Sequence, residues 1–160
     1  MKIRYNDNWK TSFAELNLNK DLPSYDFDGD LKEIKIVEED ACFYLSFLAP
    51  GGLFSKELKD RTGNEASYNR IHIDDYLDEG IVGIDSVPFG LQYALCLAST
   101  LKELKLTFRI IVSFDGDFCN VTFHRLRENE VYLDDDLNEY KLESLCVIDF
   151  GEVVGNRLSD

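Results

Sequence analysis

The most restrictive feature of this sequence is one long segment with helical spacing, residues 87–105. Apolar side chains recur there every three or four residues, which places them along one side of an α-helix. These positions are Leu91, Ala94, Leu95, Ala98, Leu101 and Leu104. Asp85 and Ser86 are favourable N-cap residues, and Pro88 suits a first helical turn. We therefore expect one dominant helix whose broad apolar surface packs on a sheet.

A β-hairpin is predicted directly after this helix. Residues 107–114 alternate between apolar and polar side chains, and residues 118–126 return as the partner strand. The alternation places Phe108, Ile110, Val112 and Phe114 on one face. Asp115-Gly116 between the two segments is a strong signal for a two-residue turn. The hairpin therefore indicates antiparallel pairing.

Weaker patterns occupy much of the remaining chain. Strand character is found at residues 1–9, 31–37, 41–48, 70–77 and 130–134, and residues 142–150 suit a helical turn or a final buried strand. A short helix is expected within 53–69, ending near Thr62-Gly63-Asn64, whereas 10–30 is polar and irregular. Together these patterns predict an α+β fold of six to eight mostly antiparallel strands. The 160 residues fit a single domain spanning 1–160.

The sequence is strongly acidic throughout. Thirty-one Asp and Glu residues outnumber seventeen Lys and Arg residues, which gives a net charge of −14. Residues 1–80 contribute −7 (17 acids, 10 bases) and residues 81–160 another −7 (14 acids, 7 bases), so the charge is not confined to a tail. Without a basic run, nucleic acid and anionic membranes are disfavoured partners. The charge favours a basic protein partner, although it can also serve solubility alone.

The sequence carries no export signal that we recognise. Its first residues lack the apolar core of a signal peptide, and no run approaches the roughly 18 apolar residues of a membrane span. We therefore expect a cytoplasmic protein. The four cysteines, Cys42, Cys96, Cys119 and Cys146, are expected to be reduced and buried as small apolar residues.

Motifs for catalysis or metal binding are weak. His72, His124 and Cys119 could form a zinc site, but a histidine with a structural role in a strand is far commoner. The acidic run at 26–30 departs from a calcium-binding loop, because glycine stands at the fourth position and Val37 at the twelfth. Clusters of carboxylates could also support acid–base chemistry, yet solvated faces are commoner. We expect no cofactor, no metal and no catalytic residue.

Two acidic segments also contain tyrosines. Protein interfaces combine central aromatic anchors with a charged rim, and carboxylates pair well with Lys and Arg. The predicted partner-binding residues are Asp74, Asp75, Tyr76, Asp78, Glu79, Tyr132, Asp134, Asp135 and Asp136. The alternative is that Tyr76 and Tyr132 pack in the core while the acids face water.

Two stretches carry a family resemblance. Gly83-Ile84-Asp85-Ser86, followed by Gly90-Leu91-Gln92-Tyr93-Ala94-Leu95 and Leu97-Ala98, resembles a G-x-D-S…L-Q-A-L…L-A segment of small bacterial proteins encoded near toxins. The acidic α+β chain with a late strand at 145–150 is similar to immunity proteins of contact-dependent growth inhibition and other polymorphic toxin systems. The resemblance implies a cytoplasmic, non-catalytic protein. Such a protein binds a cognate toxin, often a nuclease, and covers its active site.

The resemblance and the composition leave other classes open. A secretion chaperone is also small and acidic, but it usually dimerises and begins with an amphipathic helix, whereas residues 1–9 resemble a strand. An unrecognised enzyme and a nucleic-acid binder rank below it. We expect the protein to be a monomer before it binds its basic toxin partner.

Overall fold

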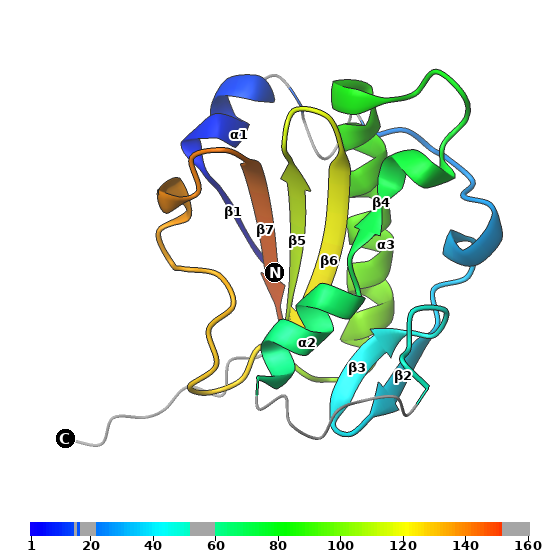
Figure 1. The fold of residues 1–160 in the computed structure, drawn as a ribbon, viewed down its shortest axis with the longest axis vertical. Coiled ribbons are helices and arrows are strands. Elements are labelled where there is room, and N and C mark those ends of the chain that lie inside the picture. Colours follow the sequence, from blue (N-terminus) through cyan, green and yellow to red (C-terminus); the bar gives the residue numbers. More distant parts are fainter. Residues whose placement is uncertain (15, 17–21, 52–59, 152–160) are drawn as a thin grey trace.

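The computed structural model describes residues 1–14, 16, 22–51 and 60–151. Within them, a five-stranded sheet in the order β1-β7-β5-β6-β4 forms the centre, and every neighbouring pair is antiparallel (Figure 1). Its strands are β1 (Lys2–Tyr5), β4 (Ile71–His72), β5 (Phe108–Phe114), β6 (Cys119–Arg125) and β7 (Ser144–Phe150). A separate antiparallel hairpin joins β2 (Ile36–Glu39) to β3 (Cys42–Leu45). The helices are α1 (Asp7–Ser12), α2 (Arg61–Tyr68) and α3 (Val87–Lys102). The α+β prediction is therefore confirmed.

The main core lies between α3 and one face of the sheet (Figure 1). The helix buries Leu91, Ala94, Leu97, Ala98 and Leu101, and β5 contributes Phe108, Ile110, Val112 and Phe114. The predicted helix positions 91, 94, 98 and 101 and the predicted face of β5 are thus confirmed, whereas Leu95 is half-buried and Leu104 lies exposed beyond the end of the helix. Gly90 permits a close approach, because a Cβ there would lie 2.5 Å from the Cys119 sulfur on β6. The dominant helix is therefore held tightly against the centre of the sheet.

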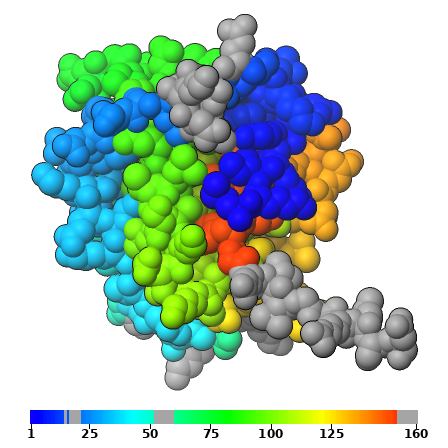
Figure 2. Space-filling model, turned by 180° about the vertical axis from the view of Figure 1, so that it is seen from behind, coloured from blue at the N-terminus to red at the C-terminus, as the bar shows by residue number. Residues whose placement is uncertain are grey.

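The outer side of α3 is bordered by two other parts of the chain. Figure 2 shows the helix between residues 22–51 on one side and the N-terminal residues on the other. The Gln92 side chain ties the first of these segments to the helix, because it donates to the Tyr25 carbonyl at 2.8 Å and accepts from the Tyr25 amide at 3.2 Å.

Cys96 is exposed on α3, which corrects the expectation that all four cysteines are buried. Cys42, Cys119 and Cys146 are buried.

The opposite face of the sheet is covered by α2 and by residues 126–143 (Figure 1). Leu133 and Leu137 of that segment form a second, smaller core with Ile111, Leu145 and Val147. No helix in the parts of the chain that the structure describes is long and apolar enough to cross a bilayer.

Some predicted element boundaries are wrong for identifiable reasons. The first strand ends at Tyr5, because the Asn6 side chain accepts a hydrogen bond from the Trp9 amide at 2.9 Å and caps α1. The second helix does not end near Thr62-Gly63-Asn64; these residues are its first turn, capped by Asp60, whose side chain accepts from the Gly63 amide at 2.8 Å. The predicted residues 53–59 of that helix lie outside the described part of the chain.

Three further strand predictions change. Residues 70–77 form a strand only at Ile71–His72, and a 3₁₀ turn follows at Ile73–Tyr76. The strand expected at 31–37 occupies Ile36–Glu39, with its turn at Asp40 and Ala41, which both have positive φ. Residues 130–134 are not a strand.

The predicted cap of α3 also differs. Ser86 does not cap the helix with its side chain, since its hydroxyl donates to the Gly83 carbonyl at 2.6 Å.

Candidate protein-binding surface

Three segments meet at one end of the sheet: the turn between β5 and β6, the 3₁₀ turn at Ile73–Tyr76 and the one at Gly83–Ser86 (Figure 1). The half-buried Asp74 joins them. One of its carboxylate oxygens accepts from the Cys119 amide at 2.8 Å, and the other accepts from the Gly83 amide at 3.1 Å. The sequence predicts that Asp74 contacts a partner; in the structure its carboxylate holds these segments together.

Large apolar side chains are exposed on the segments that Asp74 joins. Val82 is 64% exposed, Ile84 53% and Phe118 49%. Val82 and Ile84 flank Gly83, and Phe118 precedes Cys119, so each lies next to a backbone amide that Asp74 binds. A single exposed apolar residue is ordinary, but several on adjoining segments are typical of a binding surface.

Exposed carboxylates lie on the same segments. They are Asp75, Asp78, Glu79, Asp85, Asp115 and Asp117. We call these acids, together with Val82, Ile84 and Phe118, the acidic edge. An apolar centre with a charged rim is the arrangement found in many protein interfaces.

The Asp115 carboxylate also shapes this surface. It accepts hydrogen bonds from the backbone amides of Phe118 at 2.8 Å and Asp117 at 3.0 Å. These bonds stabilise the charged form and lower the pKa of Asp115 below its ordinary value. The turn that presents Phe118 is therefore held by an ionised carboxylate.

The tyrosine of the first predicted segment has a more structural position. Tyr76 is half-buried and packs against the main core, and burial raises the pKa of its hydroxyl. Asp75, Asp78 and Glu79, by contrast, are exposed on the acidic edge. Tyr76 therefore follows the alternative in which the tyrosine packs against the core while the neighbouring acids face solvent.

The second predicted segment lies at the other side of the sheet. The Asp135 carboxylate is fully exposed and lies 3.9 Å from the Arg4 guanidinium on β1, the edge strand opposite β4. The Asp134 amide donates to the Tyr140 hydroxyl at 3.0 Å, and the Asp136 side chain accepts from the Asn138 amide. The structure therefore does not bring Asp134–Asp136 together with the acidic edge.

Tyr132 of that segment covers a buried histidine. Its ring lies edge-on to His124, with centroids 5.5 Å apart. Burial lowers the pKa of His124 to about 4, so this imidazole is neutral at physiological pH. Beside it on the same face, the Arg109 guanidinium binds both oxygens of Asp149, at 2.7 and 3.0 Å.

The zinc arrangement considered from sequence does not form. Cys119 faces α3, whereas His124 faces the opposite side of β6. His72 is exposed and lies against Phe118, with ring centroids 5.8 Å apart. Among the residues that the structure describes, no three His, Cys, Asp or Glu side chains are grouped to hold a metal ion.

Sequence reasoning missed the apolar centre of the acidic edge and part of its rim. In the sequence, Asp85 is a candidate N-cap of the helix, and Phe118 belongs to the strand predicted at 118–126. No local pattern reveals their common position, because Asp74 reaches Cys119 across 45 residues of sequence. The signal available in the sequence is weak: it consists of apolar residues that stand next to acids, as Ile84 does beside Asp85 and Phe118 beside Asp117.

The fold and this surface define a small, acidic α+β protein with an antiparallel sheet, one dominant helix and an acidic, partly apolar edge. The chain belongs to the Uncharacterized protein PM0498 family, whose family model matches residues 4–157. It is 31% identical over 80 residues to Uncharacterized protein PM0498 of Pasteurella multocida (strain Pm70), which covers 48% of this chain and 49% of that protein. The match therefore spans about half the length of this curated relative. No solved structure matches the chain.

Proposed function

We propose that this protein is an immunity protein that binds a basic toxin domain, of nuclease type, through the acidic edge and covers its active site. The observation that carries the proposal is the exposed apolar group of Val82, Ile84 and Phe118 inside a rim of carboxylates. The resemblance of residues 83–98 to immunity proteins supports the same class.

The chemistry of the rim suits a nuclease. A nuclease active site concentrates Lys and Arg to hold phosphate, and carboxylates form strong charge-assisted hydrogen bonds with the same side chains. The net charge of −14 also draws a basic partner toward the protein before contact. Asp75, Asp78 and Glu79 thus take the place of nucleic-acid phosphates.

The apolar centre supplies affinity that carboxylates alone do not. Exposed charge pairs contribute little in water, whereas buried apolar anchors dominate most interfaces. Because Asp74 already holds the segments in place, less conformational freedom is lost on binding. In this proposal the protein is a bacterial, cytoplasmic monomer until it meets its toxin.

Co-expression tests the proposal. The toxin domain encoded beside the gene is expressed in bacteria with the wild-type protein, and with a variant carrying Asp75→Asn, Asp78→Asn and Glu79→Gln. We expect the wild type to restore growth and to co-purify with the toxin, and the variant to protect less well. A variant with Asp134, Asp135 and Asp136 changed to Asn is the matched control at the opposite edge.

Several outcomes would contradict the proposal. The absence of a neighbouring toxin gene, or equal protection by the wild type and an empty vector, removes the immunity role. If only the Asp134–Asp136 variant loses protection, the interface lies at the other edge of the sheet. An obligate dimer that carries a secreted effector instead of a toxin domain would favour the chaperone alternative.

A further inference from the structure

A pocket of about 310 Å³ lies at the end of the sheet where β5 ends and β7 begins, next to the acidic edge. Helix α1 and the β5–β6 turn lie at this same end (Figure 1). The helix provides Asn8 and Thr11 to the wall of the pocket, and the end of β5 and the turn after it provide Phe114 and Asp115. Leu142, from the segment before β7, lines it as well. A water molecule occupies roughly 30 Å³ of liquid, so this Asp115 pocket has room for a long side chain.

The side chains that α1 places in the wall have already committed their donors. The Asn8 Nδ2 donates to the carbonyls of Lys141, at 2.9 Å, and Glu143, at 3.3 Å. The Thr11 hydroxyl donates to the Asp7 carbonyl at 2.9 Å. What these two side chains still offer to a partner is the Asn8 Oδ1 and the lone pairs of the Thr11 oxygen, and both can only accept a hydrogen bond.

The Asp115 carboxylate adds a negative charge to these acceptors. The amides of Asp117 and Phe118 both donate to its Oδ1, at 3.0 and 2.8 Å, which leaves Oδ2 for a donor from another molecule. These bonds, and to a smaller extent the positive charge of Arg70, lower the pKa of Asp115. No ion pair joins Asp115 to Arg70 or to another cation among the described residues. The pocket therefore contains an ionised oxygen without a counterion.

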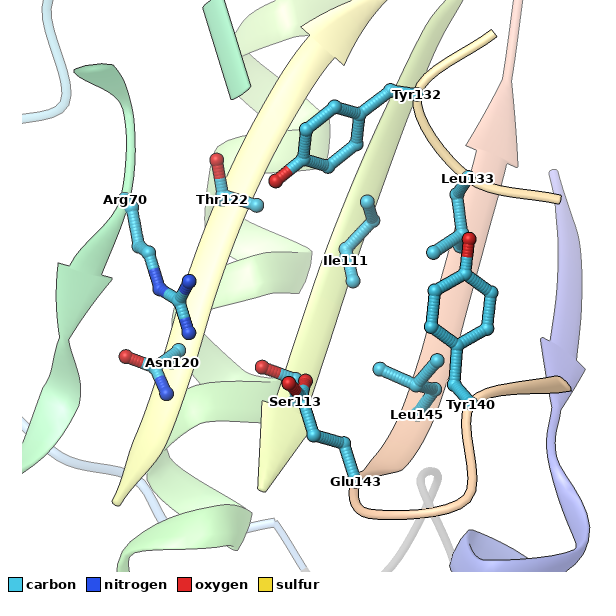
Figure 3. A pocket seen from close by; sticks show the side chains of 10 residues that line it. All are labelled: Arg70, Ile111, Ser113, Asn120, Thr122, Tyr132, Leu133, Tyr140, Glu143 and Leu145. Atoms are coloured by element: carbon cyan, nitrogen blue, oxygen red, sulfur yellow. The ribbon is translucent and has the colours of Figure 1, made fainter. Parts of the chain in front are cut away.

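Leu142 gives the same pocket an apolar side. Figure 3 shows the loop between Tyr140 and Glu143, whose side chains turn over the sheet face and line a separate cavity. Leu142, between them in sequence, lines the Asp115 pocket instead and is 90% exposed. An exposed leucine beside a carboxylate suits a side chain that has an apolar stem and a charged head.

We infer that the Asp115 pocket receives an arginine side chain of the partner protein described under the proposed function, on which this inference rests. A guanidinium group carries five N–H donors and no acceptor, which matches the free acceptors of Asp115, Asn8 and Thr11. The methylene stem of the arginine packs on Leu142. A lysine ammonium has three donors on a point charge and satisfies this spread of acceptors less well. The interface thus continues from the acidic edge past Asp115 to α1.

A titration with a small ligand tests the pocket without the toxin. Nα-acetyl-arginine amide is added to ¹⁵N-labelled protein and followed by nuclear magnetic resonance. The control ligand is Nα-acetyl-citrulline amide, in which a neutral ureido group replaces the guanidinium group at nearly the same size. We expect saturable shifts of the Gly116 backbone amide, which lines the pocket, and of the Asn8 side-chain amide, with the citrulline compound binding at least fivefold more weakly.

Other results of this titration would overturn the inference. They are equal binding of the two compounds, tighter binding of Nα-acetyl-lysine amide, the absence of a saturable shift, and shifts that concentrate at residues 75–79 instead of the pocket. Because the toxin is not used, each of these results removes the arginine pocket alone. Failure of the proposed function appears separately, as a loss of growth protection by the wild-type protein.

Variants assign the binding to the pocket. Asp115→Asn keeps an oxygen for the two turn bonds and puts a donor in place of Oδ2, and Leu142→Ser removes the apolar side at an exposed residue. We expect each to weaken binding of the arginine compound at least threefold. The matched controls outside the pocket are Asp135→Asn, at a fully exposed carboxylate, and Val131→Ser, at a side chain that is 77% exposed; both should leave the affinity unchanged. Unchanged affinity in Asp115→Asn, or an equal loss in the controls, would overturn the inference.

Discussion

The Asp74 carboxylate accepts a hydrogen bond from the backbone amide of Cys119 at 2.8 Å and so ties the edge of the sheet to the turn between β5 and β6. Its second oxygen binds the Gly83 amide at 3.1 Å. One side chain therefore positions both sides of the acidic edge. Without it, the backbone amides of Cys119 and Gly83 would lose the partner that orders them.

Replacing Asp74 should lower stability. In Asp74→Asn the amide nitrogen must face one of the two backbone donors, so at least one hydrogen bond is lost. We expect the free energy of unfolding to fall by about 1–3 kcal/mol in urea denaturation. Asp75→Asn, on the same 3₁₀ turn but exposed, is the control and should change stability by less than about 0.5 kcal/mol. Equal stability of the Asp74 variant and the wild type would contradict this account.

The buried ion pair of Glu65 and Arg127 provides a second prediction. Arg127 bonds both Glu65 oxygens, at 2.6 and 2.8 Å, and the same oxygens accept from the amides of Phe43 at 2.8 Å and Arg125 at 2.7 Å. The Glu65 side chain is fully buried. Arg127→Met leaves this charge without its cation, so we expect a loss of about 3–5 kcal/mol in thermal or denaturant unfolding.

The exposed Arg61→Met at the start of α2 is the control for this change. It removes the same charge without exposing a buried carboxylate. If both variants are equally stable, the ion pair does not hold α2 between β3 and the end of β6.

The local patterns that were predicted well are those completed by neighbours in sequence. The spacing of Leu91, Ala94 and Leu101 defines α3, and the alternation on either side of Asp115-Gly116 predicts the hairpin, although four residues (115–118) rather than two separate its paired ends Phe114 and Cys119. Both depend on interactions within a few residues, for which sequence periodicity and turn chemistry are sufficient. The fold class follows from these two elements and the remaining strand patterns.

The elements that were missed depend on distant partners. Ile71 and Ile73 alternate as in a strand, but the chain turns at Ile73 and Asp74 bonds amides 9 and 45 residues away. Residues 126–143 carry apolar side chains because they cover a sheet face, not because they extend it. For the site, the exposed acids at 75, 78 and 79 could be predicted from composition. Val82 and Phe118, by contrast, are placed at the same edge only by the long-range hydrogen bonds of Asp74 to Gly83 and Cys119.

His124 should make stability depend on pH. Burial is the main reason that its pKa falls from 6.5 to about 4. The positive charges of Arg109 and Arg127 lower the pKa further, whereas the hydrogen bond to the Arg125 carbonyl and the negative charge of Asp149 raise it. Between these pH values the unfolded chain binds a proton that the folded protein does not, so stability falls as pH falls through this window. This loss of stability is absent above pH 6.5 and complete near pH 4, where it amounts to about 3 kcal/mol of unfolding free energy.

His124→Gln should remove this contribution. We expect the difference in unfolding free energy between pH 7 and pH 4.5 to shrink by about 2–3 kcal/mol in the variant. His72→Gln, which changes an exposed histidine, is the control and should keep the wild-type slope. An unaltered pH profile for His124→Gln would show that folding does not lower the pKa of His124 and would contradict this account.

Asn120 gives a further stability prediction. Asn120→Leu removes a buried carboxamide that has no partner among the described residues. We expect the free energy of unfolding to rise by about 1–3 kcal/mol in urea denaturation. A loss of stability would mean that ordered water already satisfies this side chain.

The affinity between this protein and the proposed toxin domain tests the central claim most directly. Val82, Ile84 and Phe118 are changed together to Ser, and the dissociation constant is measured by surface plasmon resonance beside that of the wild type. We predict at least a hundredfold weaker binding, about 2.7 kcal/mol, with the Asp134–Asp136 variant unchanged. An unaltered dissociation constant for the Ser variant would contradict the account.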